Sequence, residues 1–114
     1  MEFNLDIGNV VSNMVQASSN ALIKGGRQAV EFATHEYTQF IRDIEHIQTM
    51  AEKGTITDET AQALVEQHKF SMQTVLLAVE GLSLITVQNA INAALKVLNG
   101  VLTAVSGAAL KFAL

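Results

Sequence analysis

The chain has 114 residues, no proline and no cysteine, and a formal net charge of −4 at pH 7. Its hydrophobic content of 49% excludes an intrinsically disordered protein, and the lack of cysteine excludes disulfides and thiolate metal sites. Because lysine and arginine do not cluster anywhere, the sequence predicts no nucleic-acid partner.

The first predicted helix covers about residues 8–23. Asn4 or Asp6 can cap its beginning, because each side chain can accept a hydrogen bond from the first turn. The pair Gly25-Gly26 favours a helix end, since glycine readily adopts the left-handed C-cap conformation. The apolar stripe of this helix consists of Val11, Met14, Val15, Ser18, Ala21 and Leu22.

The second predicted helix, about residues 27–53, has the clearest amphipathic pattern in the chain. Its apolar residues recur at steps of three and four, which is the period of a helix face. These residues are Val30, Ala33, Tyr37, Phe40, Ile41, Ile44, Ile47 and Ala51.

A short turn over residues 54–57 follows the second helix. Gly54 can end that helix, and Thr57 can cap the next one. Asp58 and Glu59 then lie in the first turn, where carboxylates interact favourably with the helix dipole. A connection this short predicts that the two helices are antiparallel neighbours.

The third predicted helix begins at Asp58 and extends to about residue 112. Its apolar face repeats with a period of roughly eleven residues, which suits a nearly straight helix. As one continuous helix it would be about 85 Å long at 1.5 Å per residue, too long for a compact domain of this size. We therefore predict either a break near Gly81 or Gly100, or a rod that requires partners.

Together these elements predict one all-α domain over residues 1–114. We expect an antiparallel helical hairpin with an additional N-terminal helix, packed as an oligomeric helical bundle.

Charge is unevenly distributed along the chain. Among the 7 basic and 11 acidic residues, 13 lie between Lys24 and Lys69, and only Glu80, Lys96 and Lys111 follow. The last forty residues therefore present more apolar surface than a three-helix monomer should be able to cover, which predicts self-association. The residues assigned to this homo-oligomeric interface are Leu76, Val79, Val87, Ala90, Ala94, Leu98, Val101, Val105 and Phe112.

A membrane-active oligomer, similar in principle to a pore former or holin, is the alternative function. The apolar runs on either side of Lys96 are each shorter than the roughly 20 residues that a membrane-spanning helix needs. A single span would place Lys96 near its middle, at a cost of about 2.5–3.5 kcal/mol. We therefore expect a cytoplasmic protein. Membrane association is the less favoured alternative.

A metal-binding bundle is a third, weaker alternative. Asp43 and His46 have i, i+3 spacing and Glu31 and His35 have i, i+4 spacing, but a di-metal site needs several such pairs facing inward. Surface side-chain pairing explains these spacings better, so no metal or other cofactor is predicted. His68 lies at the margin of the apolar face, where we expect a partly buried histidine, and Glu80 lies at the edge of that face.

Motifs for catalysis are missing from the sequence. It contains no nucleophile elbow, no glycine-rich phosphate or dinucleotide loop and no His-Glu-x-x-His zinc motif. The sequence therefore predicts a non-enzymatic protein with no small-molecule substrate and no catalytic residues. The acidic residues near the N-terminus do not resemble the basic start of a signal peptide.

Overall fold

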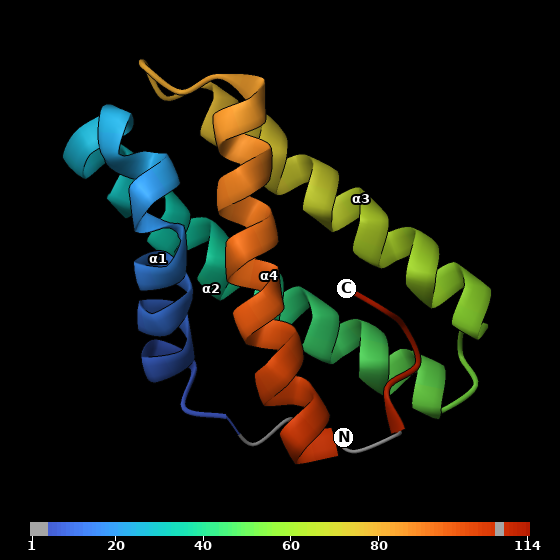
Figure 1. Ribbon diagram of the computed structural model, residues 1–114. Helices are drawn as coiled ribbons and strands as arrows, with labels where there is room; N and C mark the ends of the chain where they lie inside the picture. Colours follow the sequence, from blue (N-terminus) through green and yellow to red (C-terminus); the bar gives the residue numbers. More distant parts are fainter. Residues whose placement is uncertain (1–4, 107–108) are drawn as a thin grey trace.

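The computed structural model describes residues 5–106 and 109–114, and within these ranges the chain is helical without strands. Figure 1 shows the arrangement of its helices. In chain order they are α1 (Ile7–Leu22), the 3-10 helix η1 (Ile23–Gly25), α2 (Gly26–Glu52), α3 (Asp58–Leu77) and α4 (Leu84–Ser106). The predicted all-α fold class is confirmed.

Helix α1 begins and ends close to the predicted positions. Asp6 is its N-cap, and the Asp6 carboxylate accepts a hydrogen bond from the Asn9 amide at 3.2 Å. The other predicted cap, Asn4, lies outside the described residues. After α1 the chain tightens into η1 and turns at Gly26, whose φ of +61° is in the range that favours glycine.

The connection between α2 and α3 has the predicted local chemistry. Gly54 adopts φ +74°, and the Thr57 hydroxyl accepts a hydrogen bond from the Thr60 amide at 3.0 Å. Asp58 and Glu59 occupy the first turn of α3, as expected. Helices α2 and α3 pack along each other beyond this connection (Figure 1).

The predicted helix over residues 58–112 is divided in two. It breaks between Leu77 and Leu84, where Gly81 has φ +92°, so the break expected near Gly81 is confirmed. The alternative break near Gly100 is wrong, because Gly100 lies within α4. A new cap at Ser83, whose hydroxyl accepts from the Thr86 amide at 3.2 Å, restarts the helix.

Tertiary contact explains why the break lies at Gly81. A Cβ atom added there would lie 2.8 Å from the carbonyl oxygen of Lys24, so the loop between α3 and α4 approaches η1 too closely for a side chain. This loop turns α4 back onto the molecule. The protein measures 42 × 24 × 17 Å, much shorter than a continuous rod would be.

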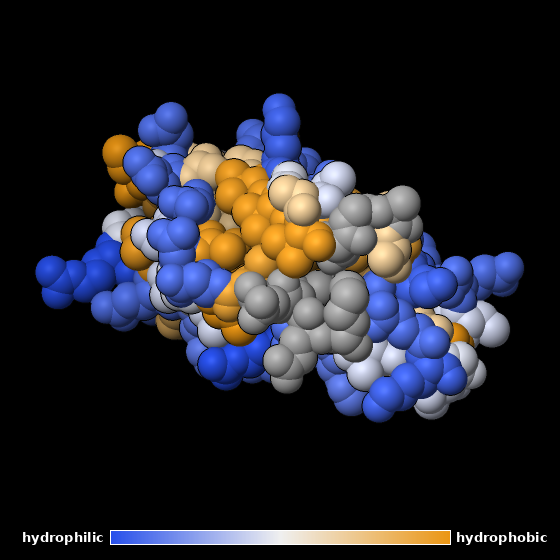
Figure 2. All heavy atoms as spheres, turned by 90° about the horizontal axis from the view of Figure 1, so that it is seen from below, coloured by the Kyte–Doolittle hydropathy of each residue, from blue (hydrophilic) through white to orange (hydrophobic). Residues whose placement is uncertain are grey.

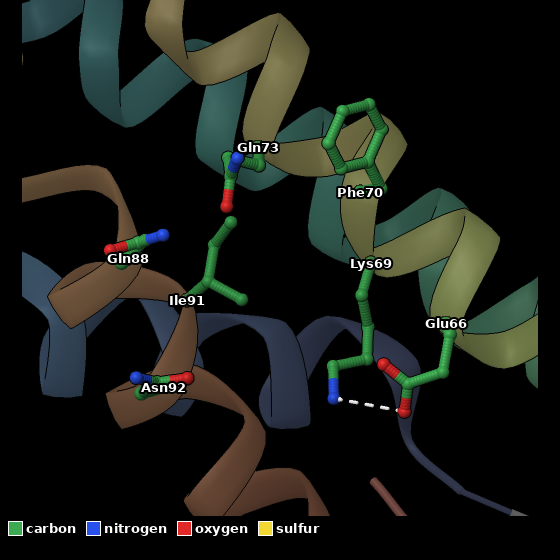
Figure 3. Close-up of a pocket in the computed structure, with 7 residues that line it drawn as sticks. All are labelled: Glu66, Lys69, Phe70, Gln73, Gln88, Ile91 and Asn92. Atoms are coloured by element: carbon green, nitrogen blue, oxygen red, sulfur yellow. Dashed lines mark hydrogen bonds and ion pairs between the residues drawn. The ribbon is translucent and has the colours of Figure 1, made fainter. Parts of the chain in front are cut away.

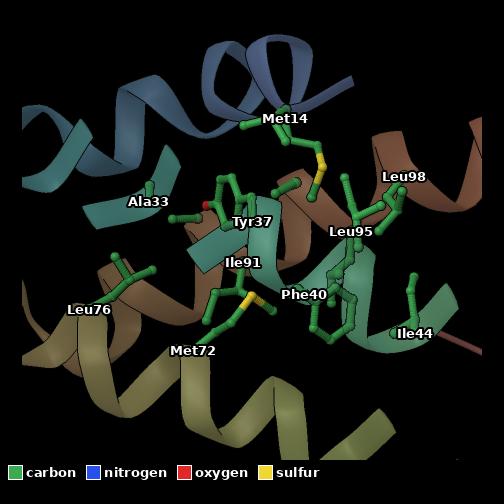
Figure 4. Close-up of a cluster of buried hydrophobic side chains, with 14 of the residues drawn as sticks. Met14, Ala33, Tyr37, Phe40, Ile44, Met72, Leu76, Ile91, Leu95 and Leu98 are labelled. Atoms are coloured by element: carbon green, nitrogen blue, oxygen red, sulfur yellow. The ribbon is translucent and has the colours of Figure 1, made fainter. Parts of the chain in front are cut away.

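The hydrophobic core lies where all four helices meet. Helix α1 packs along α4, and α2 packs along α3, with α4 crossing in front of α2 in Figure 1. Figure 4 shows side chains from every helix converging on one cluster. Its labelled members include Met14 of α1, Tyr37, Phe40 and Ile44 of α2, Met72 and Leu76 of α3, and Ile91, Leu95 and Leu98 of α4.

The predicted continuation of the third helix to residue 112 is also wrong. Helix α4 ends at Ser106, and residues 110–114 are not helical. We call residues 109–114 the strap, because this segment lies between α3 and α4 in Figure 1 and bonds to side chains of α2 and α3. Phe112, in the strap, is buried in the core.

Candidate interaction surface

The residues predicted to bind a second copy mostly pack inside a single chain. Seven of the nine are buried: Leu76, Val79, Val87, Ala90, Ala94, Leu98 and Phe112. Val101 is half-buried, and Val105 is 50% exposed. The premise that one chain cannot cover this face is therefore wrong, because α1, α2 and α3 supply the covering surface.

The face of the molecule built by α1 and α4 is nearly free of charge. Helix α1 contains no charged residue, and Lys96 is the only one in α4. We call the exposed side of these two packed helices the α1/α4 surface. Small and amide side chains dominate it, among them Ser12, Asn13, Gln16, Asn89, Asn92 and Asn99.

An apolar patch lies at the end of the molecule where α1 begins and α4 ends (Figure 2). Val105 is the most exposed large apolar residue described at this end. Leu5, Ile7, Val101 and Leu110 are partly buried against the core in the same segments. This patch adjoins the α1/α4 surface, so the two form one candidate site.

A groove of about 290 Å³ separates α3 from α4. Figure 3 shows Gln73 of α3 and Ile91 of α4 reaching into this gap, with Phe70 on the outer side of α3. Lys69 and Glu66 form an ion pair at its rim, with 3.4 Å between Nζ and Oε1. The groove offers amide and apolar contacts around this ion pair.

The carboxylate–histidine pairs differ from those that helical spacing suggested. Asp43 lies 3.3 Å from His68 across the interface of α2 and α3, and Gln39 donates to the same carboxylate at 3.1 Å. His68 is half-buried, as expected. Within residues 5–106 and 109–114, no three histidine or carboxylate side chains are placed to share a metal ion.

A buried hydrogen-bond chain joins α1 to α2. The Tyr37 hydroxyl donates to Ser18 Oγ at 3.1 Å, and the Ser18 hydroxyl donates to the carbonyl of Met14 at 2.9 Å. Burial raises the pKa of the Tyr37 hydroxyl above its ordinary value of 10.0, while the hydrogen bond to Ser18 lowers it by a smaller amount. Ser18, which lies in the predicted apolar stripe, is therefore buried with its hydroxyl hydrogen-bonded to Tyr37 and to the Met14 carbonyl.

The only tyrosine in the chain permits a direct test of this burial. We expect the near-ultraviolet absorbance of Tyr37 to titrate with a midpoint above 10.0. Since the folded state holds the phenol proton more tightly than the unfolded state, stability falls as the pH rises above about 10. Tyr37→Phe should remove this part of the decrease while costing about 1 kcal/mol at neutral pH. A normal titration midpoint in protein that circular dichroism shows to be folded would contradict the prediction.

None of the helices in the part of the chain described here has the length and apolarity that crossing a membrane requires.

Comparisons of the chain with protein-family models, with curated proteins and with solved structures give no significant match, so the assignment of function depends on the surface described above.

Proposed function

We propose that this chain is a non-enzymatic structural or assembly protein that associates with further copies of itself through the α1/α4 surface. The observation that carries the proposal is the depletion of charge in α1 and α4, where Lys96 is the single charged residue, whereas α2 and α3 contain most of the charged residues of the chain. The interface is thus the outer side of these helices. The inner side, where most of the nine predicted residues lie, is core.

The chemistry of the α1/α4 surface favours a like partner. Asparagine, glutamine and serine side chains both donate and accept hydrogen bonds, so one such surface can complement an identical one. Charged residues are depleted at the centres of protein interfaces, and a nearly neutral surface brings no like charges together. In a two-fold symmetric pair the same residues would meet from both copies.

The apolar end supplies the hydrophobic part of such an interface. Val105 and the half-buried Val101 lie on the last two turns of α4, at the end of the molecule where α1 begins (Figure 1). Burial of exposed apolar area contributes about 25 cal/mol per Å² before the costs of association are subtracted. We therefore place the anchor of the interface at Val105.

Val105→Glu is expected to weaken self-association about tenfold or more, because the interface would have to desolvate a carboxylate without a partner. Analytical ultracentrifugation over a range of protein concentrations measures the change. Leu77→Glu is the matched control, since Leu77 is 38% exposed on α3, away from α1, and should leave association unchanged. A wild-type chain that remains monomeric at all concentrations would contradict the proposed function.

The apolar end would equally suit the alternative, a membrane-active oligomer. Sedimentation with phosphatidylcholine vesicles distinguishes the two functions. If the protein associates in solution and stays in the supernatant, the assembly function is supported. If it pellets with vesicles in a manner that Val105→Glu abolishes, the membrane-active function replaces it.

A further inference from the structure

The strap is held as a peptide ligand would be, through its backbone. The amide of Gln48 donates through Nε2 to the carbonyl of Ala109 at 2.9 Å and accepts at Oε1 from the Lys111 amide at 2.9 Å. Gln48 belongs to α2 and is 0% exposed. Both ends of one buried side-chain amide are therefore used by the strap.

Helix α3 provides the second part of this binding site. Gln62 donates to the Ala113 carbonyl at 2.9 Å and accepts from the Ala113 amide at 2.7 Å, so it pairs with both polar groups of one residue. Lys69 donates to the carbonyl of Leu114 at 3.3 Å. We call Gln48, Gln62 and Lys69, with the core position that receives Phe112, the strap-binding site.

The strap-binding site requires an occupant. If the strap left, the buried amide of Gln48 would lose its hydrogen bonds to Ala109 and Lys111 and keep only its contact with Glu52, and the loss of hydrogen bonds by a buried polar group is unfavourable. The position filled by Phe112, which is only 8% exposed, would also be open to solvent. An empty site is therefore unfavourable, and a segment that restores these hydrogen bonds and covers this apolar position should bind to it.

We propose that the strap-binding site takes an extended apolar peptide in trans, and that its partner is the strap of a second copy of this chain. The side-chain amides of Gln48 and Gln62 form hydrogen bonds with backbone groups of the bound segment, which any sequence can supply. The buried position of Phe112 favours a segment with an aromatic side chain at that point. The segment that meets both requirements in this structure is the strap itself, and every copy carries an identical one. Ala113 is exposed, so this end of the site is accessible from outside.

A strap in its own chain competes with a strap from another. Attachment to the same chain gives the resident strap an effective concentration of roughly millimolar or more, without any difference in contacts. The wild-type site is therefore filled from within. Binding in trans becomes measurable when the resident strap is weakened and the site itself is left intact.

The test is a titration of the full-length, isotope-labelled chain with a synthetic peptide of residues 109–114, following the side-chain amide signals of Gln48 and Gln62 by NMR. Phe112→Ala weakens the resident strap and leaves the site unchanged. This variant should bind the peptide about tenfold more tightly than the wild-type chain does. A peptide with the same Phe112→Ala change should lose this advantage.

Damage to the site should have the opposite effect to damage to the strap. Adding Gln62→Ala to the Phe112→Ala chain removes two solvent-exposed hydrogen bonds to the peptide and should weaken its binding about fivefold. A folded Phe112→Ala chain that binds the peptide no more tightly than the wild type would overturn the proposal.

A milder variant covers the case in which Phe112→Ala does not fold. Ala113→Pro removes the amide that donates to Gln62 and keeps the Phe112 side chain. It should bind the peptide about threefold more tightly than the wild-type chain, and no gain would again overturn the proposal. Because the titration needs no association through the α1/α4 surface, its failure is distinct from failure of the proposed function.

Discussion

Leu98→Ala is expected to lower the free energy of unfolding by about 3 kcal/mol, because deleting a fully buried leucine side chain loses its transfer free energy and leaves a cavity. Leu98 is 0% exposed in α4 and packs within the core cluster. A loss of this size is a large part of the 5–15 kcal/mol typical of a small domain. Urea denaturation followed by circular dichroism measures it.

The matched control is Ile85→Ala. Ile85 is a large aliphatic residue in the same helix but 71% exposed, so its truncation should change the free energy of unfolding by less than about 0.5 kcal/mol. This pair separates core from interface. If Leu98 instead contacted a second copy, as the sequence suggested, Leu98→Ala would reduce association and leave the unfolding of the single chain nearly unchanged.

Gly81→Ala is expected to lower the free energy of unfolding by about 2 kcal/mol or more. The substitution places a Cβ on a residue with φ +92° and 2.8 Å from the Lys24 carbonyl oxygen. A left-handed backbone disfavours a side chain by about 1–2 kcal/mol, and relief of the contact requires the loop to move away from η1. Thermal denaturation should show a clearly lower melting temperature.

Gly100→Ala should have the opposite sign. Gly100 is exposed within α4, and an added Cβ meets nothing within 4 Å. Alanine in a helix interior is more favourable than glycine by about 0.5–1 kcal/mol, so this variant should be more stable than the wild type. Destabilisation by Gly100→Ala, or a neutral Gly81→Ala, would contradict the account of where and why the helix breaks.

The location of the break illustrates the limit of sequence reasoning in this chain. Both Gly81 and Gly100 satisfied the local criterion, because glycine permits a break without requiring one. The difference between them is the approach of Gly81 to Lys24, which lies 57 positions earlier in the chain. Such contact depends on how the helices pack, and helical periodicity does not contain it.

The strap and the pairing of Asp43 were missed for a related reason. The apolar spacing of Phe112 continues the pattern of α4, so it resembled helix, although Phe112 enters the core from a non-helical segment. Asp43 was compared with His46 on its own helix, while its partner is His68 on α3. The signal that could have revealed the strap is Gln48, an amide among the apolar residues of α2, since a buried amide requires partners.

The amino-acid sequence by itself determined the all-helical class, the cap at Asp6 and the turn from Gly54 to Thr57, because these depend on interactions between residues close together in the chain. It also determined that α1 and α4 are poor in charge. Only the tertiary structure decided that α4 folds back, that its apolar face becomes core, and that the neutral side faces outward. A helix wheel identifies an apolar face without identifying what covers it, and here the covering surface comes from α1, α2 and α3 of the same chain.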